Sequence, residues 1–519
     1  MDWRTNLRRA AGIAALGLMG VVLASCGGGG AESIAPQPAS LPPVLAGTGT
    51  LTIFVTDSDG RPVRDARVSV YNRRQTALIG SVQTGSNGSA TARSLPATVE
   101  FTVVHGFGYH VEKNVDVAQQ GDTAVGVTLL PGRPRPTVAL LPVEIPRGSV
   151  YPDRNELTLQ VTVIASPNAP FARSGYGDYS AASTPSLGLE LGENANDSRR
   201  ECFVWLDQRR TVPSCGTTWG TSPYTVSVEQ FRYDVVGPAP LPTSAASAQS
   251  TMLVIDQSRR VSTLDPGAFR SYAARRFIER IVSPGEQKTL SVAGFAGSGG
   301  DPATPLSLPS QPLWIPSGIG TVFTADAVVL KSNVGIIEPL VGGAAPLFDA
   351  LEAAVALTAM SAPSGDRAVV ALLGGTDDRE LTASERDRAL ASLRRQRDDT
   401  GVRAILIDAA PTMPLAEHRA IAELAAALRA PTISLGVSMD ELQYSAQRWA
   451  SGSYAALDLA ADLTEASPLP TLSAVFRVRA NTAGAFQSGA KLRGVIYVES
   501  EICPMGCWEM PLPFVVEIP

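Results

Sequence analysis

Between about residues 250 and 463, short apolar runs alternate with stretches of helical periodicity, and this alternation restricts the fold more than any other feature of the chain. The runs read TMLVI, KTLSVAGF, RAVVALL, VRAILID and PTISLGV, and their composition is typical of buried strands. Helices are expected at Ala268–Ile281, Leu347–Met360, Thr382–Arg397, Leu415–Leu428 and Met439–Trp449. The alternation predicts a doubly wound α/β domain over residues 250–463, a parallel sheet with helices on both faces.

Two of these helices begin with the spacing of a capping box. Thr382 is followed by Glu385, and Ser438 by Glu441. In this arrangement the two side chains satisfy backbone N–H groups that have no partner within the helix. The spacing therefore predicts a defined helix start at each position.

The regions on either side of this block predict β structure. Residues 48–131 contain period-two runs such as LTIFVTD and VEFTVVH, separated by turn sequences such as DSDGRP, and they predict a small β-sandwich. Further strands are expected within 135–249 and again within 465–519. Because the ends of an inserted domain usually lie close together, we favour one β region split by the α/β block. Two separate sheets are the alternative.

The first residues have the pattern of an export signal. In segment 1–26, Arg4, Arg8 and Arg9 precede an apolar stretch, Ala10–Ala24, that is too short for a comfortable transmembrane helix. Segment 27–47 is Gly-rich and then Pro-rich without an apolar period. Such a segment cannot bury a core, so it predicts a flexible tether.

The end of the signal, Leu23-Ala24-Ser25-Cys26, resembles the bacterial lipoprotein box. The resemblance implies cleavage before Cys26 and attachment of acyl chains such as palmitate, which hold a protein on a membrane without a spanning helix. Gly27 stands where an Asp would signal retention in the inner membrane, so the resemblance implies an outer-membrane lipoprotein on the periplasmic face or the cell surface. An ordinary signal peptide with a chance Cys is the alternative.

The remaining four cysteines form two pairs that are close in sequence, Cys202 with Cys215 and Cys503 with Cys507. An even number of cysteines in an exported chain predicts disulfides, the first of which would join the two strands of a hairpin. The competing interpretation of the CPMGC segment is a metal or redox motif.

Residues 48–131 resemble the carboxypeptidase-regulatory-like (prealbumin-like) domain. The positions that match its turn and core residues are Asp57, Gly60, Pro62, Ala66, Gly88, Gly108 and Tyr109. The resemblance implies a spacer or binding module. His105 and His110 flank the GFG turn, and they are either a ligand pair or exposed turn residues.

The α/β block resembles the von Willebrand factor type A (VWA) domain, because LVIDQSRR, LSVAGFAG, GGAAPLFDAL and VVALLGGTDD follow one another in the order of that family. Many members hold Mg²⁺ at the carboxyl ends of the strands. Asp256 and Ser258 match the first two ligands, but Arg260 stands at the second Ser position. Ala345 takes the place of a ligand Thr, and Gly374 that of a ligand Asp.

The resemblance therefore implies a degenerate metal site. Mg²⁺ requires about six oxygen ligands in near-octahedral geometry, which Asp256 and Ser258 cannot provide alone. We expect an ion pair between Arg260 and Asp256 in place of the metal. We also expect the positions of the degenerate site to form a binding face. Two alternatives stay open: a rearranged Mg²⁺ site of Asp256, Ser258 and Asp377, or an Asp256 that only ends a strand and caps a turn.

Composition and motifs limit the classes of function that the chain can have. The formal net charge of −6 provides no general basic field for nucleic acid. The chain has three His and no nucleophile-elbow, phosphate-loop or zinc-protease motif, so we expect no catalytic residues and no cofactor. The leading hypothesis is an envelope or surface lipoprotein, adhesive or scaffolding, that binds an unidentified protein. The alternatives are a purely structural envelope component, a metal-dependent VWA adhesin, and a hydrolase that uses carboxylates.

Overall fold

The computed structural model describes residues 47–519, apart from 58–59, 73–77, 106–107, 130–136, 166–184, 193–201, 208–209, 216–222, 235–247, 260, 262–268, 283–286, 297–312, 317–321, 341, 364, 375–380, 409–414, 435–445, 466–467 and 501–508. The predicted signal, Cys26 and nearly all of the predicted tether therefore lie outside the described residues. Among the described residues, no helix is both long enough and apolar enough to cross a membrane.

The N-terminal part consists of two small sheets that enclose one core, as the period-two pattern predicted. The first sheet has the order β4-β1-β7 and the second β3-β2-β5-β6. Inward side chains such as Leu51, Val68 and Phe101 are fully buried in the shared core. The strands are β1 (Gly49–Thr56), β2 (Arg67–Asn72), β3 (Leu78–Gln83), β4 (Ser89–Leu95), β5 (Thr98–His105), β6 (Gly108–Asp116) and β7 (Asp122–Thr128).

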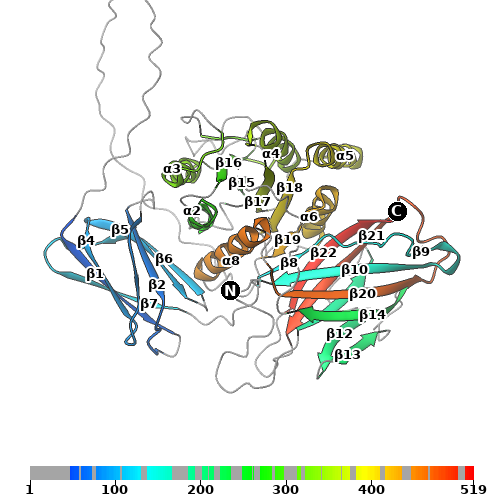
Figure 1. Ribbon diagram of the computed structural model, residues 1–519, viewed down its shortest axis with the longest axis horizontal. Helices are drawn as coiled ribbons and strands as arrows, with labels where there is room; N and C mark the ends of the chain where they lie inside the picture. Colours follow the sequence, from blue (N-terminus) through cyan, green and yellow to red (C-terminus); the bar gives the residue numbers. More distant parts are fainter. Residues whose placement is uncertain are drawn as a thin grey trace, which may run out of the picture. The chain divides into compact units, whose positions relative to one another are not determined.

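The α/β block is a parallel sheet with helices on both faces, and the predicted fold class is confirmed. Its strands have the order β19-β18-β17-β15-β16, and each neighbouring pair is parallel. Helices α2 (Phe269–Ile281), α3 (Ala327–Ile337) and α8 (Ala446–Thr464) cover one face of this sheet, and α4 (Leu347–Ser361), α5 (Ala383–Thr400) and α6 (Leu415–Leu428) cover the other (Figure 1). Alternate side chains of β15 enter the two cores: Leu253 and Ile255 pack in the first, and Met252 and Val254 in the second. The strands are β15 (Gln249–Asp256), β16 (Lys288–Phe295), β17 (Asp366–Leu373), β18 (Arg403–Asp408) and β19 (Thr432–Ser434).

The helices agree with the predicted pattern except in two places. They are α2 (Phe269–Ile281), α3 (Ala327–Ile337), α4 (Leu347–Ser361), α5 (Ala383–Thr400), α6 (Leu415–Leu428) and α8 (Ala446–Thr464). The predicted capping box of Thr382 with Glu385 is present at the start of α5, whereas Ser438 and Glu441 lie outside the described residues.

The two exceptions are α3 and α8. Helix α3 was not expected. The helix expected at Met439–Trp449 overlaps the start of α8, which extends fifteen residues further, to Thr464, and residues 439–445 lie outside the described residues. The small residues Ser451, Gly452 and Ser453 weaken the helical pattern of α8. Burial of Leu457, Leu459 and their neighbours in the core shared with α2 compensates for this low propensity.

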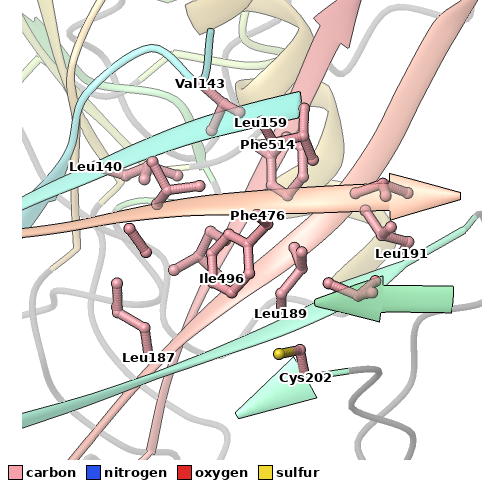
Figure 2. Packing of buried hydrophobic residues seen from close by; sticks show 14 of the residues in the cluster. Leu140, Val143, Leu159, Leu187, Leu189, Leu191, Cys202, Phe476, Ile496 and Phe514 are labelled. Atoms are coloured by element: carbon pink, nitrogen blue, oxygen red, sulfur yellow. The ribbon is translucent and has the colours of Figure 1, made fainter. Parts of the chain in front are cut away.

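The strands before and after the α/β block pair with one another. Strand β20 (Thr471–Ala480) lies between β10 (Glu156–Ala165) and β14 (Tyr224–Asp234), and β21 (Lys491–Ser500) pairs with β11 (Pro185–Leu191). Side chains from both sheets, including Leu159, Leu187, Phe476, Ile496 and Phe514, form one core (Figure 2). Strands from before and after the block therefore belong to the same sheets. The remaining strands are β8 (Val138–Leu140), β9 (Val150–Tyr151), β12 (Cys202–Asp207), β13 (Arg210–Cys215) and β22 (Glu509–Glu517).

The β region and the α/β block share a single ten-stranded sheet, which the sequence pattern did not predict. Strand β8 pairs antiparallel with β10 on one side and with β19 on the other, in the register Leu140 with Thr432 and Val138 with Ser434. The sheet of the block is therefore parallel only as far as β19, and the complete sheet is mixed.

One of the two predicted disulfides lies within the described residues. Cys202 and Cys215 are bonded and face each other at the open end of the hairpin formed by β12 and β13. Cys503 and Cys507 lie outside the described residues. The first disulfide is confirmed, and the second remains a prediction.

Candidate functional site

The candidate face is formed where the carboxyl ends of β15, β16 and β17 meet. The Gln257 backbone N–H donates to the Phe295 carbonyl at 2.9 Å, which ties the loop after β15 to the end of β16. The Gly342 N–H donates to the Gln257 carbonyl at 2.9 Å, and the Arg259 N–H donates to the Gly343 carbonyl at 3.1 Å. These bonds fix the loop that follows β15 against the segment that precedes α4.

Asp256 provides the link to the third loop. Its side chain is 2 % exposed, and its Oδ1 accepts a hydrogen bond from the Ser258 N–H at 2.8 Å. Its Oδ2 accepts from the Gly374 N–H at 3.0 Å, at the end of β17. Burial raises the pKa of Asp256 above its usual range, although these hydrogen bonds oppose the shift. Asp256 therefore holds two loops together through their backbones.

The two positions at which the VWA resemblance would place further ligands, Ala345 and Gly374, are closely packed. Ala345 is 2 % exposed and supplies no side-chain oxygen. A Cβ added at Gly374 would lie 1.8 Å from Cγ2 of Val261 and 3.4 Å from Oδ2 of Asp256. Val261 thus occupies the space in which an Asp at position 374 would have to extend its side chain.

The described residues do not fit an Mg²⁺ site. They supply one carboxylate, both oxygens of which already accept backbone hydrogen bonds, and the Ser258 hydroxyl. Mg²⁺ needs about six oxygens in near-octahedral geometry. In the part of the chain that the structure describes, no group of three or more His, Cys, Asp or Glu side chains could hold a metal. Arg260 and Asp377 lie outside the described residues, so their expected roles remain predictions.

A buried cation that the sequence did not reveal lies next to Asp256. Arg270, near the start of α2, is 2 % exposed, and its Nη2 donates to Gln257 Oε1 at 2.6 Å. Its positive charge favours the ionised form of Asp256 and lowers the pKa of that carboxyl, against the effect of burial. The sequence contained one weak indication that Arg270 is buried: apolar residues that α2 buries follow it at helical spacing. Arg260 was expected in this role because it is adjacent in sequence.

The Gln257 side-chain nitrogen is buried and has no hydrogen-bond partner among the described residues. The buried Ser258 hydroxyl lies close enough to Asp256 to favour the ionised form of that carboxyl and lower its pKa. Ser258 matches a family ligand position, and it is brought next to Asp256 as the motif predicted. Of the three His, His105 ends β5, His110 lies in β6, and His418 lies in α6.

The comparisons with known proteins give low similarities. No protein-family model and no curated protein matches the chain. An aerotolerance-related membrane protein from Bacteroides fragilis NCTC 9343 is 20% identical over 31% of this chain and 67% of its own, with a TM-score of 0.20. The pilus adhesin SpaC from Lactobacillus rhamnosus GG, in its open conformation, is 9% identical over 65% of this chain with a TM-score of 0.30, and the match spans 48% of the adhesin. Similarity at this level carries no inference about function.

Proposed function

We propose that the chain is an envelope lipoprotein, anchored through Cys26, that binds another protein through the carboxyl-end face of its VWA-like block without a metal ion. Loops at the carboxyl ends of the strands form the ligand sites of open α/β sheets. One observation carries the proposal. The Asp256 carboxylate and the backbone bonds of Gln257 and Arg259 connect the loops of this face directly, in the place where a metal would otherwise join them.

The proposal predicts that a partner contacts the face itself. Arg259 lies on this face and is exposed. Replacing Arg259 with a photo-crosslinking amino acid in living cells should give a discrete adduct, which a chelator does not abolish. The matched control is the same replacement at Arg388, an exposed residue of α5. If position 259 gives no adduct, or if EDTA removes it, the proposed metal-free binding face is wrong.

A second candidate function, a structural envelope component, is favoured by a different observation. The sheet of the α/β block continues into the β region through the pairing of β19 with β8. A structural protein that must be rigid would have a continuous sheet of this kind. A binding domain that is connected to the rest of the chain by a flexible hinge would not need one. The two candidates differ in the crosslinking experiment, because a purely structural role predicts the same background at positions 259 and 388.

A further inference from the structure

Helix α2 contains two arginines that are almost completely buried. Arg270 and Arg275 are each 2 % exposed. A guanidinium group remains charged at any physiological pH, so its burial is unfavourable unless the group forms hydrogen bonds or ion pairs. Both arginines therefore need specific partners inside the protein, and both partners belong to segments that lead to the candidate face.

The partner of Arg270 is Gln257, in the loop after β15. Arg270 Nη2 donates to Gln257 Oε1 at 2.6 Å, and the Gln257 side chain is fully buried. With its oxygen turned toward Arg270, the Gln257 amide leaves its nitrogen without a hydrogen-bond partner among the described residues. An unpaired buried N–H is unfavourable, so the charge-assisted bond to Arg270 determines how this side chain is oriented. Arg270 thereby fixes the loop that carries Asp256 and Arg259.

The partner of Arg275 is Glu338, at the end of α3. Arg275 Nη2 donates to Glu338 Oε2 at 3.0 Å, and the Glu338 N–H donates to the Val334 carbonyl at 2.9 Å, as in the last turn of a helix. A Cβ added at Gly335 would lie 3.4 Å from Arg275 Nη2. A glycine inside a helix lowers the stability of the helix, and here it leaves room for the guanidinium group. Arg275 therefore fixes the point at which the chain leaves α3.

The chain that leaves α3 enters the candidate face. Shortly after Glu338, the Gly342 N–H donates to the Gln257 carbonyl at 2.9 Å, and the Arg259 N–H donates to the Gly343 carbonyl at 3.1 Å. The loop after β15 and the segment before α4 are thus bonded to each other, and each is also held by an arginine of α2. A metal ion joins loops in a comparable way, because it binds an oxygen from each of them.

We propose that Arg270 and Arg275 are positioning residues that hold the candidate face in its binding conformation, in place of a metal ion. Arg270 acts through Gln257, and Arg275 acts through Glu338. Both arginines are buried, so neither contacts the partner itself. The inference rests on the proposed function, because it concerns the same face, but the position of the loops can be measured without any partner.

Hydrogen–deuterium exchange of the full chain, followed by mass spectrometry, measures that position. Peptides that contain Arg259 or Gly342 report on the face, because the amides of these two residues donate the hydrogen bonds that join the loops. Exchange of such amides increases when the local structure opens, even where the rest of the chain stays folded.

Two variants weaken the contacts of α2 with the face. Arg270→Met removes the charge but keeps an apolar side chain, and its matched control is Arg276→Met in the same helix, whose arginine pairs with Asp458 of α8 at 3.3 Å. Glu338→Gln removes the charge of the other contact. Its matched control is Glu279→Gln, whose carboxylate pairs with Lys331 of α3.

Exchange of the face peptides should increase about tenfold in Arg270→Met, because a buried charge-assisted hydrogen bond is lost. It should increase about fivefold in Glu338→Gln, since a neutral hydrogen bond is roughly half as strong as a charge-assisted one. Arg270→Lys keeps a charged donor and should restore most of the protection. Both controls should leave the face peptides at wild-type rates.

The inference is overturned if the face peptides exchange at wild-type rates in both variants, or if the controls accelerate them equally. If Arg270→Met does not fold, Glu338→Gln decides, because the Glu338 side chain is partly exposed and its replacement is mild. Crosslinking at position 259 separates the two proposals. Absence of the wild-type adduct contradicts the proposed function and leaves the exchange result to decide the inference. An adduct that persists in Arg270→Met at wild-type strength contradicts the inference alone.

Discussion

At the scale of single residues, the candidate face depends on Asp256 as an acceptor of backbone hydrogen bonds. Its two oxygens accept from Ser258 and Gly374, and they join loops that follow β15 and β17. If Asn replaced Asp256, the side-chain oxygen could still accept one of these hydrogen bonds. The amide NH₂ group would then face the second backbone N–H, which it cannot accept. A carboxylate is therefore required even where no cation is bound.

Asp256→Asn should lower the free energy of unfolding by about 1–3 kcal/mol, because one buried donor loses its partner. Urea denaturation measures this change. The matched control is Asp326→Asn at the start of α3, where the exposed side chain caps Val328 and Val329. Asn caps a helix about as well as Asp, so the control should change little. Equal effects of the two substitutions would contradict the role assigned to Asp256.

Gly374 and Val261 form a second residue pair with a measurable coupling. Gly374→Ala should cost about 1–3 kcal/mol of stability, because the added Cβ would meet Cγ2 of Val261 at 1.8 Å. The same substitution should cost much less in a Val261→Ala background, where the methyl group is gone. Unfolding of the two single variants and the double variant measures this coupling. Strictly additive effects would show that the contact between these residues is not what restricts position 374.

The sequence predicted some of these residues and not others, for a physical reason. Asp256, Ser258 and Gly374 follow strands in a recognisable motif, so their positions at one end of the sheet could be predicted. Val261 and Arg270 could not, because they reach the site through the packing of the loop after β15 and of α2. The pattern of a single sequence indicates where a helix or strand lies. It does not indicate which side chain from a distant segment packs next to Asp256 or Gly374.

At the scale of elements, helices α2 and α8 are joined by buried charge. Arg276 and Arg280 of α2 pair with Asp458 of α8 at 3.3 and 3.4 Å, and Arg280 also pairs with Asp462. Burial raises the pKa of Asp462 to about 6, the neighbouring acids Asp458 and Glu465 add to the shift, and Arg280 opposes it. The sequence pattern did not predict the continuation of α8 to Thr464, because it depends on contacts with α2 rather than on local propensity.

The raised pKa makes stability depend on pH. Between about pH 4 and pH 6 the folded chain retains a proton on Asp462 that the unfolded chain releases, so stability falls as the pH rises through this window. Asp462→Asn cannot titrate. The free energy of unfolding of the wild type minus that of Asp462→Asn should therefore decrease from pH 4 to pH 6 and stay constant above about pH 7. A difference that is constant or increases across the window would contradict the assignment.

At the scale of the whole molecule, the block at 250–463 is joined to the β region through a shared sheet. Its two ends lie side by side, since Gln249 Nε2 donates to the Thr464 carbonyl at 2.8 Å. The pairing of β8 with β19 and the ion pair of Arg493 with Glu423 at 3.0 Å connect the two parts. The alternation of strands and helices predicted the block, and the strands on either side of it favoured a split β region. It could not predict the shared sheet, because the partner of the short strand β8 is not specified by periodicity.

Replacing residues 250–463 with a short Gly/Ser linker should destabilise the remaining β region. The deletion exposes the edge of β8 and removes the helix that packs on β22. We expect the midpoint of urea unfolding to fall by about 1 M or more, a loss of roughly 2–3 kcal/mol. The signal of the Trp residues in the β region measures it. An unchanged midpoint would mean that the block is an independent domain, which the shared sheet argues against.

The central claim, a binding face that functions without a metal, is tested most directly by calorimetric titration of the purified chain with Mg²⁺ and Mn²⁺, beside Asp256→Ala. The account predicts no saturable heat for the wild type, because both Asp256 oxygens accept backbone hydrogen bonds and Ala345 and Gly374 supply no side-chain oxygen. Saturable binding to the wild type that is lost in Asp256→Ala would contradict it. Asp256 would then be a metal ligand after all.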